Sequence, residues 1–227
     1  MPSTTDFLLY VPIFADLPTE TIEAIARVGT RKKYAKDTPI LMEEEAGSAL
    51  FVIIEGKVKV SRTSSDGKEV ILTILSESDF FGEMAILDGQ TRSANVIALE
   101  DSELFIIRRN DFLQLLRDFP EVAIALLQEL TQRLRNADLK IKALTLKDAE
   151  GKVATVLLQI ADDIGKIKHG VVEIEKLPLQ QDLANMAGTS RETISRTFHN
   201  FAKKGLIEIE GSKLRILDYE KFKELYF

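Results

Sequence analysis

The chain has 227 residues, of which 45% are hydrophobic and 29% charged, with only 12 Gly and 6 Pro, so a disordered or fibrous chain is excluded and about two domains are expected. It has no Cys and two His, which excludes disulfides, thiolate zinc sites, iron–sulfur clusters and a Cys nucleophile, and makes any metal site unexpected. The formal net charge of −6 argues against nucleic-acid binding by the surface as a whole.

The sequence predicts a cytoplasmic protein with no membrane partner. No stretch reaches 18 consecutive apolar residues, and the first residues lack the basic start and the apolar run of a signal peptide. The sequence also shows no nucleophile with a His base, no metal-binding cluster and no phosphate-binding loop. We therefore expect a protein that is not an enzyme.

The first half of the chain predicts a short helical lead-in followed by a β domain. Residues 7–30 mix apolar runs with Pro12 and Pro18, and Thr19 or a neighbour could cap a helix. Short β-type runs follow at 50–54, 58–60, 70–75, 94–99 and 103–107, with a hairpin turn at Asp66-Gly67. This spacing predicts a barrel or roll, although a β domain without any ligand would show the same pattern.

A long helix is predicted after Pro120. Apolar residues recur there at alternating spacings of four and three: Ala123, Leu127, Leu130, Leu134, Ala137, Ile141 and Leu144. A seam of two apolar residues per heptad is typical of a coiled coil, so we expect a homodimer through this helix. Ile124, Leu126 and Leu139 broaden the stripe, and packing within the chain stays as the alternative.

The last third predicts a winged helix-turn-helix. Helical spacing covers 149–164 and 179–186, a turn at 187–189 follows, and Ser190 can cap the next helix. That helix would be buried by Ile194, Phe198 and Phe201, and a hairpin around Gly211 would form the wing. Six Lys and Arg face three Glu between residues 189 and 215, so this segment is locally basic.

One segment carries a recognisable chemistry. A Gly82-Glu83 turn stands ten residues before an Arg92-Ser93 pair. Arg92 offers a forked donor for phosphate oxygens and Ser93 adds a hydroxyl, while Gly82 allows close approach and Glu83 can accept a ribose hydroxyl. These functions together suit a small cyclic phosphate, although an isolated Glu–Arg pair is more often a surface salt bridge.

Residues 81–87 followed by 92–94 resemble the phosphate-binding cassette of cyclic-nucleotide-binding domains. The order of β domain, cassette, long helix and the segment 190–196 resembles, over essentially the whole chain, the cyclic-AMP receptor protein family of transcription regulators. The resemblance implies an α+β fold with a β-roll sensor domain at 1–119, a dimerisation helix at 120–146 and a winged helix-turn-helix domain at 147–227. It implies a homodimer that binds palindromic double-stranded DNA, is controlled by a cyclic nucleotide and contacts RNA polymerase.

The resemblance also assigns site residues. The cyclic nucleotide would be contacted by Gly82, Glu83, Met84, Ala85, Arg92, Ser93 and Ala94. DNA would be contacted by Thr189, Ser190, Arg191, Glu192, Thr193, Ser195 and Arg196. Among these, Arg191, Glu192 and Arg196 would read bases of a TGTGA-like half-site. Lys203 or Lys204, if they touch phosphate, would contribute affinity for all sequences alike. No metal and no cofactor besides the effector is implied.

The effector is the least determined part of this assignment. Cyclic-AMP-responsive relatives hold adenine with adjacent Thr and Ser on the dimer helix, where this chain has Ala137 and Asp138. Asp138 either flanks the coiled coil or accepts from a purine amino group, which suits guanine better than adenine. We expect cyclic AMP, the commoner effector, with cyclic GMP as the alternative.

Two further alternatives stay open. One is an effector-independent regulator with a vestigial cassette, and the other is a signalling module whose last third binds protein instead of DNA. Relatives that sense oxygen or carbon monoxide need Cys or His ligands in the sensor domain. Both histidines of this chain, His169 and His199, lie in the last third.

Overall fold

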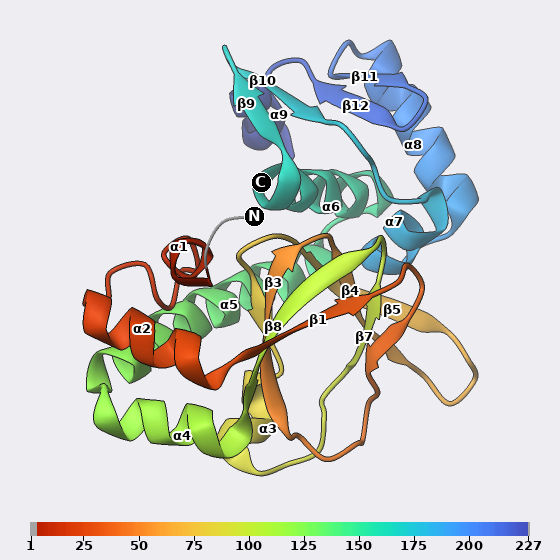
Figure 1. Ribbon diagram of the computed structural model, residues 1–227. Coiled ribbons are helices and arrows are strands. Elements are labelled where there is room, and N and C mark those ends of the chain that lie inside the picture. Colours follow the sequence, from red (N-terminus) through yellow and green to blue (C-terminus); the bar gives the residue numbers. More distant parts are fainter. Residues whose placement is uncertain (1–3, 227) are drawn as a thin grey trace. The chain divides into compact units, whose positions relative to one another are not determined.

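The computed structural model describes residues 4–226, except for the side chains of Ala143, Leu144 and Leu146. The chain forms two compact units (Figure 1). The first unit consists of Met1–Arg62 and Leu72–Arg135, and the second of Thr63–Ile71 and Asn136–Phe227.

The first unit is built around two four-stranded sheets of strand order β1-β8-β3-β6 and β2-β7-β4-β5. The strands are β1 (Thr30–Tyr34), β2 (Pro39–Leu41), β3 (Ala49–Glu55), β4 (Val58–Thr63), β5 (Glu69–Leu75), β6 (Phe80–Phe81), β7 (Asn95–Ala98) and β8 (Ser102–Arg108). All five predicted β runs are confirmed as β3, β4, β5, β7 and β8. The pairings of β3 with β6 and β8 are antiparallel, as is the pairing of β4 with β7.

Strand β3 is buried on both faces, which explains its uninterrupted apolar sequence. Because side chains alternate along a strand, Phe51 and Ile53 enter the core between the two sheets, together with Val58 and Val96 of the opposite sheet. Leu50 and Val52 face the other way into a second core. That core also receives apolar residues of helices.

The helices of the first unit cover this second core. They are α1 (Thr4–Leu8), α2 (Thr19–Val28), α3 (Glu83–Asp88), α4 (Arg109–Asp118) and the first part of α5 (Pro120–Leu146). Ile22 of α2, Phe112 of α4 and Val122 of α5 are buried there beside Phe105 of β8. The predicted lead-in helix and the predicted long helix are both confirmed.

The apolar residues of α5 divide between two faces, which corrects one part of the predicted seam. Leu126 is buried, and Leu130 packs against the core of its own unit instead of standing free for a partner. Leu127 and Leu134 are each 63% exposed. With 3.6 residues per turn, apolar residues spaced three and four apart can lie on two neighbouring faces of a helix. The sequence pattern alone does not separate these two faces. The predicted seam residue Leu144 lies outside the described side chains.

The second unit contains the helix-turn-helix and its wing. Its elements are α6 (Ala149–Ile164), β9 (Lys166–Lys168), β10 (Val171–Ile174), α7 (Gln180–Ala187), α8 (Arg191–Lys203), β11 (Ile207–Glu210), β12 (Lys213–Ile216) and α9 (Tyr219–Tyr226). The strands form one sheet of order β11-β12-β10-β9. The predicted helices and wing hairpin are confirmed, whereas β9, β10 and α9 were not predicted.

Between residues 4 and 226 the structure contains no helix that is both long enough and apolar enough to cross a membrane.

Candidate functional site

The predicted cassette begins at a glycine whose backbone other residues rarely adopt. Gly82 has a φ of +86° and stands at the N-terminal cap of α3, directly after β6. A Cβ atom on Gly82 would lie 2.9 Å from Nη1 of Arg92 and 3.0 Å from the carbonyl oxygen of Ala49. Glycine is therefore needed both for the turn and for the approach of Arg92 to the main chain.

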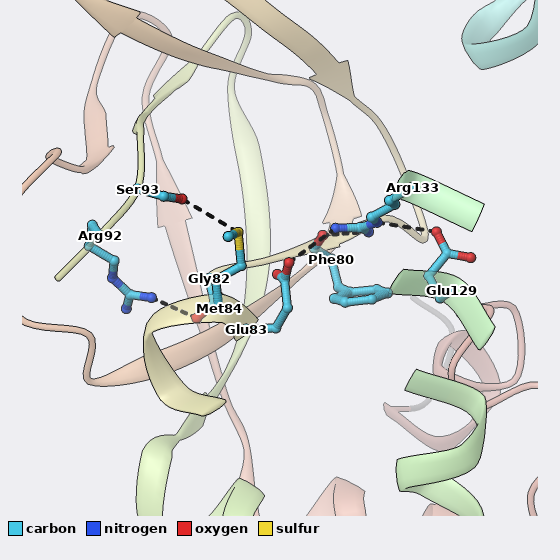
Figure 2. Close-up of polar contacts among 8 residues, drawn as sticks. All are labelled: Phe80, Gly82, Glu83, Met84, Arg92, Ser93, Glu129 and Arg133. Carbon is cyan, nitrogen blue, oxygen red and sulfur yellow. Dashed lines mark hydrogen bonds and ion pairs between the residues drawn. The ribbon is translucent and has the colours of Figure 1, made fainter. Parts of the chain in front are cut away.

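Arg92 is buried beside this turn, with 4% of its surface exposed (Figure 2). Its Nη1 donates to the carbonyl oxygen of Gly82 at 2.7 Å, and its Nη2 donates to that of Ala49 at 2.9 Å. Within the described residues its buried Nε has no hydrogen-bond partner. An unsatisfied buried donor is costly, so the Nε–H of Arg92 is available to donate to an anionic oxygen.

The other predicted cassette residues surround the same turn. Ser93 and Met84 are exposed, and the Ser93 hydroxyl donates to the Met84 sulfur at 3.5 Å. Ala85 and Ala94 are buried at 3% and 7% exposure, so their small side chains fill the space behind the turn. Two segments that are ten residues apart thus meet as the spacing predicted.

Glu83 is a buried carboxylate that turns away from Arg92 toward α5 (Figure 2). Its Oε1 lies 3.5 Å from Nη1 of Arg133. Burial raises the pKa of the Glu83 carboxyl, and the opposing attraction of Arg133 offsets this only in part. The ionised form is therefore kept at a cost in folding free energy.

Arg133 is a site residue that the sequence did not reveal. It donates through Nη2 to the carbonyl oxygen of Phe80 at 2.9 Å, pairs with Glu129 at 3.2 Å, and lies 4.1 Å above the Phe80 ring. These contacts fasten α5 to the strand that leads into the cassette. The one sequence signal is the Glu129–Arg133 spacing of four on the helix face that also carries Leu126 and Leu130.

The structure places Ala137 and Asp138 on α5 with both side chains exposed. The assignment of Asp138 to base recognition stays a prediction.

The candidate DNA-reading face lies on α8. The Ser190 hydroxyl caps this helix by accepting from the Thr193 N–H at 3.2 Å, as predicted. Ile194, Phe198 and Phe201 are buried, whereas Arg191, Glu192, Ser195 and Arg196 are exposed on the other side. Thr189 and Thr193 are half-buried at the start of the helix. The main-chain N–H and the Ser190 hydroxyl lower the pKa of Glu192, so it is ionised at neutral pH.

Several other cations of this unit are paired with carboxylates. Lys204 forms an ion pair of 2.6 Å with Glu150. On the wing, Lys213 pairs with Glu173 at 2.5 Å and Arg215 with Glu208 at 3.2 Å. Arg196 and Lys203, by contrast, form no ion pair with any residue of the described chain.

Two family models match the chain: a cyclic nucleotide-binding domain over residues 31–119 and a Crp-like helix-turn-helix domain over residues 151–225. The cyclic AMP receptor protein of Thermus thermophilus is 34% identical over 216 residues, which cover 95% of this chain and 97% of that protein. This chain belongs to the cyclic-AMP receptor protein family. It is therefore a DNA-binding transcription regulator with a cyclic nucleotide-binding domain, and the family is not one of enzymes.

Other family members give the same result. A CRP-like cAMP-activated global transcriptional regulator of Mycobacterium tuberculosis is 31% identical over 216 residues, covering 95% of this chain and 96% of that protein. The crystal structure of the Thermus thermophilus catabolite activator protein is 33% identical with a TM-score of 0.55, covering 95% and 98% of the two chains. FixK2 of Bradyrhizobium japonicum, at 23% identity and a TM-score of 0.78 over 88% and 98%, shares the fold. The predicted α+β architecture is confirmed.

Glu83→Gln should raise the thermal midpoint of the ligand-free protein by about 2 to 4 °C at pH 8, because the neutral amide avoids the desolvation cost of a buried carboxylate. The sign follows from the raised pKa: Glu83 costs nothing where both folded and unfolded states are protonated, and its cost appears as pH rises through the folded-state pKa. The gain should therefore vanish near pH 4. Exposed Glu77→Gln is the matched control. A gain that is independent of pH would contradict the assigned cost.

Proposed function

We propose that this regulator is gated by a cyclic nucleotide bound at the cassette, with cyclic AMP as the favoured effector. The observation that carries the proposal is the buried guanidinium of Arg92, which is held by two carbonyl oxygens and retains one unpartnered donor. An anionic oxygen of a bound phosphate could accept from that donor and leave both bonds that hold the turn in place.

The charges of the site suit a ribose cyclic phosphate. The phosphate would lie against Arg92 and Ser93, where a charge-assisted bond is available. A ribose hydroxyl would donate to Glu83, whose buried carboxylate has spare acceptor capacity beside Arg133. Met84, Ala85 and Ala94 would line the sugar. Ligand binding would thus offset the desolvation cost of both buried ions.

The base is proposed from the names of relatives and from the residue at position 138. The names of the Thermus and Mycobacterium relatives state cyclic AMP, which supports that effector. Asp138 replaces the Ser that holds adenine in cyclic-AMP-responsive relatives, and a carboxylate suits guanine at least as well. Cyclic GMP therefore stays as the alternative, and an effector-independent regulator is the outcome if neither nucleotide binds.

The exposed face of α5 would join two copies of the chain. Ile124, Leu127 and Leu134 are exposed by 58%, 63% and 63%, and a hollow of about 350 Å³ lies against Leu127 and Thr131. Continued along the sequence at spacings of three and four, this row reaches Asp138 and Ile141. A second copy of α5 carries the same heptad spacing and would cover this row.

Control of DNA binding would be a population shift. A dimer that binds two half-sites about 34 Å apart needs its two recognition helices at a fixed distance and orientation relative to each other. A nucleotide that binds the competent arrangement more tightly must raise the affinity for DNA. Arg133 is the residue through which the cassette would act on α5, because it contacts Glu83, Glu129 and Phe80 together.

We place the functional boundaries at 1–119 for the sensor, 120–146 for the dimer helix and 147–227 for the DNA-binding domain, which the two matched family models support. As a transcription regulator it would act in the cytoplasm and contact RNA polymerase. Its operator would be a palindrome of TGTGA-like half-sites.

Arg92→Lys should weaken binding of cyclic AMP at least about tenfold, because a single ammonium cannot reproduce the forked donor. Titration calorimetry of the wild type with cyclic AMP, cyclic GMP and cyclic di-GMP would identify the effector, and the same titration of the variant tests the residue. Arg62→Lys, at an exposed pair with Glu43, is the control and should bind like the wild type. An unchanged Kd in Arg92→Lys would show that the cassette does not hold the phosphate.

Leu127→Glu combined with Leu134→Glu should produce monomers, because two charges one heptad apart cannot be buried in a coiled-coil seam. Sedimentation velocity measures this directly. Leu9→Glu, at an apolar residue exposed by 47% outside α5, is the control and should stay dimeric. A dimer that survives the double substitution would place the interface elsewhere.

Arg196→Ala should relax base preference at one symmetric pair of operator positions, with a loss of about 1 to 3 kcal/mol for the preferred base. Binding selection from a randomised palindrome measures it. Lys203→Met is the control, since losing a phosphate contact weakens all sequences alike. If Arg196→Ala behaves like this control, the residue contacts phosphate instead of a base.

A further inference from the structure

We infer that Glu150 and Tyr226 are positioning residues that lock the C-terminal end of α8 to the junction after α5. This inference rests on the proposed function, in which α5 makes the dimer and α8 reads DNA. All the residues concerned belong to the second unit.

The lock is centred on one carboxylate oxygen. Oε1 of Glu150, in the first turn of α6, accepts from Nζ of Lys204 at 2.6 Å and from the hydroxyl of Tyr226 at 2.5 Å. Lys204 is the C-terminal cap of α8, and Tyr226 is the last residue of α9. Three helices thus meet at a single acceptor.

The same cluster reaches the junction itself. Lys147, the first residue after α5, donates through Nζ to the main-chain oxygen of Tyr226 and, at 2.9 Å, to the hydroxyl of Thr155 on α6. Asp148 caps α6 by accepting from the N–H of Gly151 at 2.8 Å. The junction consists of Lys147 and Asp148, and the side chains of both residues hold it in place.

An aromatic cluster beneath these polar bonds makes the lock rigid. Phe201 of α8 packs against Phe222 and Tyr226 of α9, with ring centroids 5.3 and 5.2 Å apart. Phe201 and Phe222 are fully buried. At its other end α9 is fixed by a hydrogen bond from the Tyr219 hydroxyl to Asp162 of α6. Helix α9 is thus fastened at both ends, and α8 cannot turn on α6 without breaking these contacts.

The charges of the lock are stable at neutral pH. Hydrogen bonds from Lys204 and Tyr226 lower the pKa of Glu150, and its carboxylate in turn raises the pKa of Lys204. Burial, followed by the bond to Glu150, raises the pKa of the Tyr226 hydroxyl, which keeps its proton. Lys204 therefore stays paired with Glu150. Of Lys203 and Lys204, Lys203 is then the one available to contact a phosphate.

Functionally, the lock sets where α8 lies relative to the end of the dimer helix. A dimer can prefer one separation of half-sites only if this placement is fixed in each copy. Loosening the lock should therefore reduce the discrimination between operator spacings, whatever happens to total affinity.

The test uses Glu150→Gln and Lys204→Met in the full chain. They change the charge near DNA in opposite directions but break the same bond. Binding is measured to a selected palindrome and to versions lengthened by one and two base pairs. We expect both variants to reduce the spacing preference at least about fivefold, the lower end of ordinary couplings between sites. The affinity for cyclic AMP should stay unchanged.

Two further variants complete the design. The exchanged pair Glu150→Lys with Lys204→Glu should recover part of the spacing preference, since the ion pair is reformed with reversed polarity, whereas a lysine at position 150 cannot accept from the Tyr226 hydroxyl. Lys203→Met should weaken binding to all operators alike and keep the preference. Hydrogen exchange of α9 amides in each variant verifies that the fold persists.

Opposite shifts in affinity with an unchanged spacing preference would overturn the inference, because Glu150 would then act through charge alone. Failure of the exchanged pair to recover the preference, with α9 still protected, would also overturn it. A wild type that binds half-sites without regard to spacing would instead overturn the proposed dimeric function, and this inference with it.

Discussion

The arrangement of the first unit depends on the burial of two opposite charges, Glu83 and Arg92, on either side of Gly82. Moving one ion out of water costs roughly several kcal/mol even after the protein relaxes. Each of the two buried side chains therefore needs partners of fixed position. Arg92 is satisfied by carbonyl oxygens of the turn and of β3, whereas Glu83 depends on Arg133 of α5. The cassette is therefore complete only when α5 is in place. A ligand bound at the cassette can for this reason act on α5.

Helix α5 meets this condition because its faces carry different chemistry. Val122 and Leu126 are buried in the core, and one turn further on Glu129 and Arg133 supply charge to the cassette. Leu127 and Leu134 lie on a different face, which is exposed and apolar. Helix α5 thus packs on its own unit, contacts the cassette and presents an apolar face that a second copy could cover. A shift of the helix at one of these faces would therefore move the other two.

The sequence was sufficient where the determining contacts are local. The strands, the long helix, the Gly82 turn and the Ser190 cap follow from periodicity and from the conformational needs of single residues. Arg133 was missed because its role depends on the register of α5 against β6, which no local pattern encodes. Leu130, which the sequence placed in the dimer seam, also packs against the core of its own unit, because coiled-coil and intramolecular stripes overlap at these spacings. The partner of Lys204 lies 54 residues earlier in the chain, beyond any local rule.

Charge pairing explains how an acidic chain can be a selective DNA-binding protein. Lys204 at the end of α8, and Lys213 and Arg215 on the wing, are paired with Glu150, Glu173 and Glu208, which weakens their attraction to phosphates in general. Arg191, Glu192 and Arg196 are exposed on the first half of α8, where they can meet base edges. In the proposed dimer, a weaker general attraction for DNA would make affinity depend more on correctly placed contacts at two half-sites together. Affinity would then depend on the placement of α8, a property that a ligand acting through α5 could change.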